Sequence, residues 1–123
     1  MTIKKGIFIL SVVSLLMLFS CEKQEDVAVK YIATNAVSEF HLSYRLPSGE
    51  LKAETITASS MQDKWSYSFT AQQDDIVYLS GNYKDINSGL KLLILMDGKV
   101  YKQASTVGDT INFVIVSGTV PIE

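Results

Sequence analysis

Residues 65–70 read WSYSFT, and this alternation decides the fold class. Trp65, Tyr67 and Phe69 are large and aromatic, whereas the residues between them carry small hydroxyl side chains. In an extended chain successive side chains point to opposite faces, so this pattern puts one face in a core and the other in water. Aromatic residues also favour strands. The stretch therefore predicts a half-buried β-strand.

The same period of two recurs along the chain from Val27 onward. Apolar and polar residues alternate over 40–46, and the apolar residues of 111–115 share one face. Turn signals separate these stretches. The strongest is Asp97-Gly98, because Asp-Gly between apolar runs favours a two-residue hairpin turn. Strands are expected near residues 27–34, 38–46, 51–57, 64–71, 75–82, 90–97, 99–105 and 110–117.

Short strands at regular spacing, without an amphipathic helical pattern, predict an all-β domain. We expect an immunoglobulin-like antiparallel β-sandwich of about seven or eight strands, and a small barrel is the alternative. The run Leu90–Met96 is almost continuously apolar, which predicts a central strand covered on both faces. The Cys–Trp–Cys spacing of true immunoglobulin domains is absent, so the expected likeness is one of general form.

The first 20 residues have the features of a removable export signal. Lys4 and Lys5 give a positive start, and residues 7–19 carry no charge. This apolar run is shorter than the roughly 20 residues that a membrane-spanning helix needs. A positive start, an apolar centre and a small residue at the cut are typical of a secretory signal peptide. We expect residues 1–20 to be removed, and a spanning helix is the alternative.

Cys21 is the only cysteine of the chain. The sequence LFSC at 18–21 resembles the lipobox of bacterial lipoproteins, in which the cysteine thiol is acylated and the cysteine becomes the new N-terminus. The resemblance implies an exported protein that is anchored by lipid to a bacterial membrane. The outer membrane is the one expected, with the domain on its periplasmic or its surface face. It also explains why the chain has no disulfide framework. An ordinary signal peptide followed by a chance cysteine is the alternative.

Residues 21–26 are expected to form the lipidated cysteine and a flexible tether, because they are rich in charge and lack large apolar side chains. The segment also resembles the lysine-plus-acidic export signal of surface lipoproteins in the Bacteroides group, and a plain solvated linker is the alternative. Residues 27–123 then form one sandwich domain, which is a length that supports a single hydrophobic core.

The charge balance excludes one class of partner. The chain has 11 basic and 13 acidic side chains and a net charge of −2, and the loss of Lys4 and Lys5 with the leader would make it −4. Phosphate binding needs a basic patch, and the sequence has no run of five or more basic residues. We therefore expect no nucleic-acid partner.

Three motifs follow one another in the domain. They are a strand at 40–49 that ends in a Tyr-x-x-x-x-Gly turn, two strands at 64–71 and 75–80, and an Asp-Gly hairpin at 92–102. Together they resemble the small accessory proteins of the mycobacterial membrane family, called MmpS, and lipoproteins of Bacteroides-type bacteria that share that domain. The resemblance covers about residues 29–118. It implies an immunoglobulin-like sandwich with a non-catalytic accessory role, and it brings no catalytic residues.

The sequence offers no clear reactive cluster. His41 is the only histidine and is expected to be exposed, with Ser43 on the same face, but neither an oxyanion hole nor a second zinc ligand accompanies them. Asp74-Asp75 and Asp85-x-Asn87-x-Gly89 resemble calcium loops only in part, and the same residues form ordinary turns. We expect no catalytic residues, no metal site and no cofactor.

Aromatic side chains are the remaining contact candidates. The stripe within 65–70 is expected in the core, whereas Tyr31, Tyr83 and Tyr101 are expected to be partly exposed and, if they cluster, to contact a partner or ligand. The predicted protein is a non-enzymatic, lipid-anchored envelope module that binds membrane lipid through Cys21 and an envelope protein through its domain. The alternative is a surface module that binds a ligand or glycan, which needs an outward aromatic platform or a polar pocket.

Overall fold

The computed structural model describes residues 26–108 and 111–121, which form antiparallel strands in two sheets. The prediction of an all-β domain is confirmed, and every expected strand is present, with ends that differ by at most three residues from those expected. The strands are β1 (Asp26–Thr34), β2 (Phe40–Arg45), β3 (Leu51–Ile56), β4 (Trp65–Gln72), β5 (Ile76–Tyr83), β6 (Gly89–Met96), β7 (Lys99–Val107) and β8 (Phe113–Thr119).

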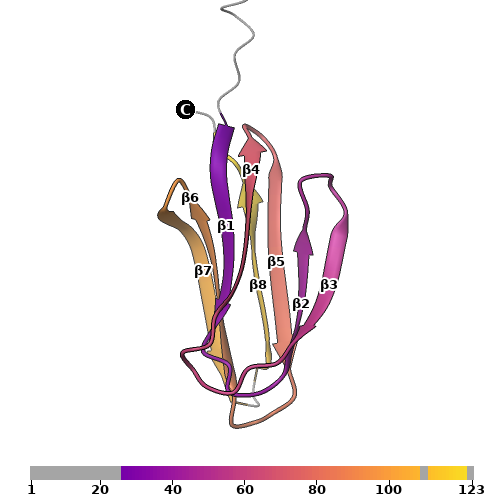
Figure 1. Ribbon diagram of the computed structural model, residues 1–123, viewed down its shortest axis with the longest axis vertical. Coiled ribbons are helices and arrows are strands. Elements are labelled where there is room, and N and C mark those ends of the chain that lie inside the picture. The colour runs from indigo at the N-terminus through magenta and orange to yellow at the C-terminus, as the bar shows by residue number, and fades with distance from the viewer. Residues whose placement is uncertain (1–25, 109–110, 122–123) are drawn as a thin grey trace, which may run out of the picture.

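The two sheets each contain four strands, in the orders β4-β1-β6-β7 and β3-β2-β5-β8 (Figure 1). We call them sheet A and sheet B. Only the connections β2–β3 and β6–β7 join neighbours in one sheet, and the others cross between the sheets. Because both strand orders are open, each sheet has two edge strands, and the architecture is a sandwich rather than a closed barrel.

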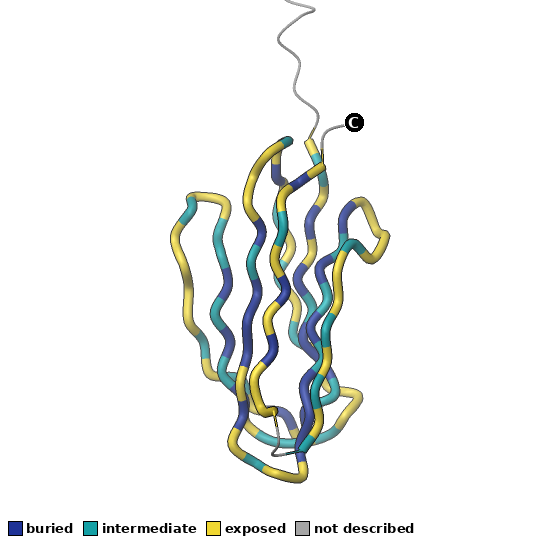
Figure 2. Tube along the Cα trace, turned by 180° about the vertical axis from the view of Figure 1, so that it is seen from behind, coloured by how far each residue is buried: buried dark blue, intermediate teal, exposed yellow. Residues whose placement is uncertain are grey.

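One core fills the space between the sheets. The inward side chains of β1, β2, β5 and β6 are buried, whereas the edge strands are more exposed (Figure 2). The alternation predicted from the sequence produces this result, because only one face of each sheet meets the other sheet. The largest fully buried side chains are Tyr31, Tyr44, Tyr83, Leu42, Leu79, Leu90, Leu92, Ile94, Val29, Val77 and Val120.

Strand β6 differs from its prediction on one face. It is central in sheet A, as expected, and Leu90, Leu92 and Ile94 are fully buried. On its other face Leu93 and Leu95 are only half-buried. The expectation of cover on both faces is wrong, because a two-layer sandwich packs each sheet on one side only. A continuous apolar run fits a strand in the middle layer of a three-layer fold, and among residues 26–108 and 111–121 no third layer covers β6.

The β6–β7 hairpin turns at Asp97-Gly98, as the sequence predicts. Both residues have positive φ, +50° and +81°, which is the requirement of a type I′ turn. Asp97 also accepts a hydrogen bond at Oδ1 from the Ala28 N–H, at 3.0 Å. That contact ties the turn to the beginning of β1.

The ends of the sandwich differ in their relation to the N-terminus. Strand β1 begins at Asp26, beside the β4–β5 turn, at what we call the entry end (Figure 1). It finishes at Thr34, at what we call the distal end, together with the β3–β4 and β5–β6 connections. A nine-residue strand spans roughly 27 Å. The two ends are therefore well separated, and the tether predicted at 21–26 would join the entry end.

Candidate functional site

Tyr31 is not a contact residue on the surface. Its side chain is fully buried, and its hydroxyl donates to the Arg45 carbonyl at 3.0 Å and accepts from the Tyr78 N–H at 3.3 Å. The pairing of β2 with β5 ends at Tyr44 and Leu79. Arg45 and Tyr78 are the next residues along this antiparallel ladder, so the hydroxyl lies where the next ladder bond would form. Burial raises the pKa of Tyr31, and the bond from Tyr78 partly offsets this. The residue connects sheet A to sheet B.

Tyr83 and Tyr101 also use their hydroxyls on backbone carbonyls. Tyr83 is buried and donates to the Gly108 carbonyl at 2.8 Å, and half-buried Tyr101 donates to the Thr119 carbonyl at 3.0 Å. The expected exposure is therefore wrong for Tyr31 and Tyr83. The reason is that each ring fills the interior while its hydroxyl donates to a backbone carbonyl of a distant segment.

The aromatic stripe of β4 faces the other sheet. Tyr44 of β2 lies with its ring centroid 4.9 Å from that of Trp65 and 5.3 Å from that of Tyr67. Phe69 lies 5.1 Å from Tyr31. Because β4 is an edge strand, the three stripe residues remain half-buried and do not project outward as a platform. The stripe packs against the core, as the alternation in the sequence predicts.

His41 projects from the outer face of sheet B, as expected, and engages its neighbours rather than Ser43. Its Nδ1 is 2.9 Å from the Thr55 hydroxyl, and its Nε2 is 3.8 Å from a carboxylate oxygen of Glu39. Ser43 faces Ser80 of β5, whose hydroxyl donates to the Ser43 carbonyl at 3.5 Å. No hydrogen bond joins His41 to Ser43 in the described part of the chain.

The two partial calcium-loop motifs make turns. Asp75 accepts the Gln72 N–H at Oδ2 at 2.9 Å, and Asp85 accepts the Asn87 N–H at Oδ1 at 2.9 Å. These are the hydrogen bonds by which acidic residues stabilise a turn. Asp74 has φ of +71°, which is also a turn conformation. Within residues 26–108 and 111–121 no three His, Cys, Asp or Glu side chains gather into a group that could hold a metal ion.

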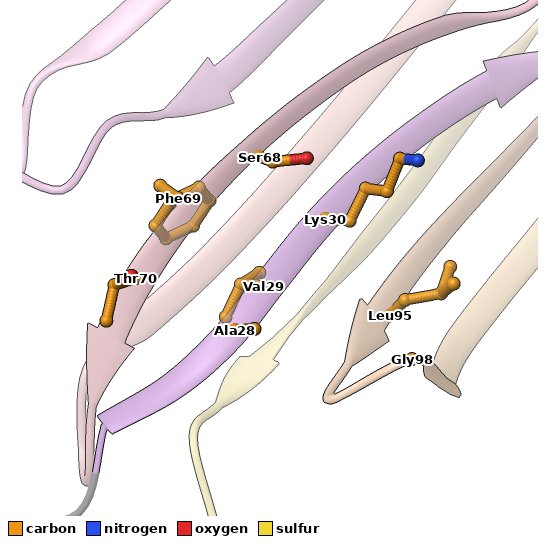
Figure 3. A pocket seen from close by; sticks show the side chains of 8 residues that line it. All are labelled: Ala28, Val29, Lys30, Ser68, Phe69, Thr70, Leu95 and Gly98. Atoms are coloured by element: carbon orange, nitrogen blue, oxygen red, sulfur yellow. The ribbon is translucent and has the colours of Figure 1, made fainter.

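A depression of about 430 Å³ lies on the outer face of sheet A (Figure 3). Its floor consists mostly of small residues, and Lys30 is its only charged one. A specific ligand site needs several polar groups that converge on one point. This shallow surface does not provide them. Its lining residues are Ala28, Val29, Lys30, Ser68, Phe69, Thr70, Leu95 and Gly98.

The distal end holds the strongest candidate for a binding site, and the sequence does not reveal it. Met61, Ile86 and Val107 come from three separate segments, line one cavity of about 410 Å³ and remain 55%, 61% and 78% exposed. We call Met61, Ile86, Val107 and the neighbouring Val37 the distal apolar surface. Exposed apolar side chains that gather in one place mark contact sites on soluble domains. Val37, Met61 and Ile86 are isolated residues in connections, and Val107 is the last residue of β7, so no periodic pattern in the sequence reveals this surface.

Hydrogen bonds hold the segments of this surface together. Ser88 accepts the Val37 N–H at its Oγ at 3.1 Å, and its carbonyl accepts the Gly108 N–H at 3.1 Å. On the other side, the Thr34 hydroxyl donates to the Met61 carbonyl at 3.4 Å. The connections therefore form a fixed scaffold, which lowers the entropy cost of binding.

Cys21, the predicted lipid attachment site, lies outside the described residues, as do the expected leader and most of the tether. No helix in the described part of the chain is long and apolar enough to cross a membrane. No protein-family model matches the chain, and no curated protein is significantly similar to it.

Proposed function

We propose that this protein is a non-enzymatic bacterial lipoprotein, anchored through acylated Cys21, whose domain binds an envelope protein with its distal apolar surface. The observation that carries the proposal is the position of that surface. It lies at the end of the sandwich opposite Asp26, roughly 27 Å from it along β1. A tether at the entry end would therefore leave the distal end free to meet a partner.

The predicted anchor gives this arrangement a mechanism. Lipid attachment confines the domain to one membrane and raises its effective concentration toward a partner in the same membrane. A modest apolar surface then suffices, because the tether replaces part of the affinity that a freely diffusing protein would need. The exposed side chains of Met61, Ile86 and Val107 supply the kind of contact that such an interface uses at its centre.

The strand pairing supports an immunoglobulin-like form for the sandwich. Strands β1 and β4 pair as B and E do in immunoglobulin domains, and β2, β5 and β8 are ordered as C, F and G. The β6–β7 hairpin occupies the side of β1 where strand A would lie. This correspondence also fits the MmpS-like resemblance, which stays part of the proposal together with its non-catalytic accessory role.

Site-specific photocrosslinking in intact cells tests the function. The full chain is produced with a photoactivatable amino acid at Ile86, which is exposed at the distal end. We expect a discrete adduct with one envelope protein. Met61→Ser combined with Val107→Ser should abolish the adduct, because it removes the apolar contact. Both residues are more than half exposed, so the fold should persist.

The matched control carries the same probe at Ser66, an exposed residue on the outer face of sheet A. It should give no adduct of that size. A Cys21→Ala chain should give a weaker adduct, because the tether is lost. Equal adducts from Ile86 and Ser66, or no adduct from Ile86, would overturn the proposal.

A further inference from the structure

Strand β8 differs from the other edge strands of the sandwich. Proteins protect exposed edges with charged side chains or with bulges. Strand β3 carries Lys52 and Glu54, and β7 has a bulge opposite Ile94 and Leu95. In β8 and its flanks, over 111–121, there is no charged residue, and its pairing with β5 is regular.

The outward side chains of β8 are apolar. Phe113 and Ile115 are 46% and 44% exposed, whereas Val114 and Val116 on the inner face are buried. Strand β4 is also uncharged, but its outward residues between Trp65 and Gln72 are hydroxyl-bearing, so pairing there would bury no apolar side chain. Strand β8 is therefore the edge at which the pairing of a further strand would bury the most apolar side-chain surface.

The hydrogen-bond pattern shows which backbone groups of β8 point away from β5. The Tyr83 N–H donates to the Asn112 carbonyl, and the Val120 N–H donates to the Asp75 carbonyl. In an antiparallel ladder successive residues direct their N–H and C=O groups to alternate sides. Even-numbered residues of β8 therefore bond to β5. The odd-numbered Phe113, Ile115, Ser117 and Thr119 direct both groups to the free edge.

Side chains of β7 close both ends of this free edge. The Tyr101 hydroxyl donates to the Thr119 carbonyl at 3.0 Å, and the Thr106 hydroxyl donates to the Ile111 carbonyl. Between these two caps, the outward N–H and C=O groups of Phe113, Ile115 and Ser117 have no partner among the described residues. The open window is centred on Ile115, with the two caps four residues away on either side.

From this geometry we infer that β8 pairs with β8 of a second copy of this chain, antiparallel, about a two-fold axis at Ile115. Ile115 then faces Ile115 of the other copy, and Phe113 faces Ser117 on each side. Each such pair exchanges two backbone hydrogen bonds, which satisfies the open window. The exposed Phe113 and Ile115 side chains of both copies meet on the outer face of the joined sheet.

Two features favour a second copy over an unrelated strand. The window is symmetric about Ile115. A two-fold axis there places the unpaired N–H and C=O groups of one copy opposite those of the other, and the capped carbonyls of Ile111 and Thr119 opposite each other. The uncharged stretch at 111–121 also lets two identical chains approach although each has a net charge of −2. Two-fold pairing of identical surfaces is the commonest form of protein association.

Sedimentation equilibrium of the full chain in detergent tests the pairing. We expect a reversible dimer. Ile115→Lys should weaken the dimer by about tenfold or more, because two like charges would face each other directly. A mixture of Ile115→Lys and Ile115→Glu chains should associate again. The matched control is Ile76→Lys, which is 52% exposed against 44% for Ile115 and lies on the same face of sheet B outside the window; it should leave the dimer intact.

Oxidation of an Ile115→Cys chain tests the register. Facing residues of a hydrogen-bonded pair have Cα atoms about 5.5 Å apart, which a disulfide can span. We expect rapid dimer formation from Ile115→Cys, and none from Ser105→Cys on β7 or from the unchanged chain with Cys21 alone. A monomeric full chain, a dimer that resists Ile115→Lys, or equal oxidation at Ser105 would overturn the inference. Crosslinking at the distal end is independent of these results, so the two proposals fail separately.

Discussion

Tyr31, Tyr83 and Tyr101 each donate a hydrogen bond to a backbone carbonyl on a distant part of the chain. Chains of this size have one core and little surplus stability, so each cross-sheet connection matters. The rings supply apolar surface to the core, and the hydroxyls satisfy carbonyl groups that a ladder leaves unpaired. At the scale of single residues, tyrosine takes the role that a disulfide takes in many exported domains.

Tyr31→Phe should lower the free energy of unfolding by about 1–3 kcal/mol. The substitution keeps the ring but leaves the Arg45 carbonyl and the Tyr78 N–H without their shared partner. Urea denaturation followed by circular dichroism measures the change. Tyr67→Phe is the matched control, because Tyr67 is only half-buried and its hydroxyl makes no hydrogen bond within the described residues. It should change stability by less than about 0.5 kcal/mol, and equal losses in both variants would contradict the role of the hydroxyl.

Tyr44 should make stability fall at alkaline pH. Burial, and then the hydrogen bond that its hydroxyl donates to Glu54, raise its pKa well above the ordinary value of 10.0. The unfolded chain therefore loses this proton first. Stability from this group is complete below about pH 10 and is lost as pH rises from there toward the raised pKa.

Urea denaturation between about pH 9 and pH 11 measures this dependence. The loss attributable to Tyr44 approaches about 1.4 kcal/mol per pH unit, and Tyr44→Phe should remove it from the slope. A slope that is the same in the unchanged chain and in Tyr44→Phe would show that Tyr44 is not the titrating group.

At the scale of elements, the β6–β7 hairpin depends on one backbone conformation. Gly98 has φ of +81°, and a Cβ atom built there meets no atom within 4 Å. Gly98→Ala therefore creates strain without a clash, and it should lower the free energy of unfolding by about 1–2 kcal/mol. Thermal or urea unfolding measures this. The comparison is Gly81→Ala, whose Cβ would lie 2.5 Å from a methyl group of Leu90 and should cost more because the core must shift.

The strands were predictable from the sequence because their signal is local. Alternation at 40–46 and 65–70, and the Asp97-Gly98 turn, each depend on a few adjacent residues. The burial of Tyr31 and Tyr83 was not predictable, because their hydroxyls donate to the carbonyl groups of Arg45 and Gly108, which are distant in the chain. The distal apolar surface is harder to predict still, since it combines residues of three connections with the last residue of β7.

At the scale of the whole molecule, the direction of β1 orders the parts. It runs from the entry end to the distal end, so an anchor before Asp26 and a contact surface at Ile86 would lie on opposite sides of the domain. The free edge of β8 runs along the side of the sandwich between these ends. When two copies pair through β8, their β8 strands run in opposite directions, so the two entry ends lie toward opposite ends of the joined sheet. If both are anchored in one membrane, the tethers must be long enough to reach it from both entry ends.

Mass spectrometry of the mature N-terminus tests the predicted lipid anchor at Cys21. We expect the chain to begin at Cys21 and to carry acyl groups on it, because the lipobox-like LFSC precedes it. Each buried CH₂ contributes about 0.8 kcal/mol, so one acyl chain holds a protein only reversibly, whereas several hold it stably. The unchanged protein should therefore stay with the membrane through a high-salt wash. Cys21→Ala should keep its leader or appear in the soluble fraction, and Ser20→Ala, which preserves a small residue at the cut, should behave as the unchanged chain does. An unmodified Cys21 in a mature chain would leave an exported domain without a lipid anchor, and the proposed presentation of the distal surface by a membrane tether would then be wrong.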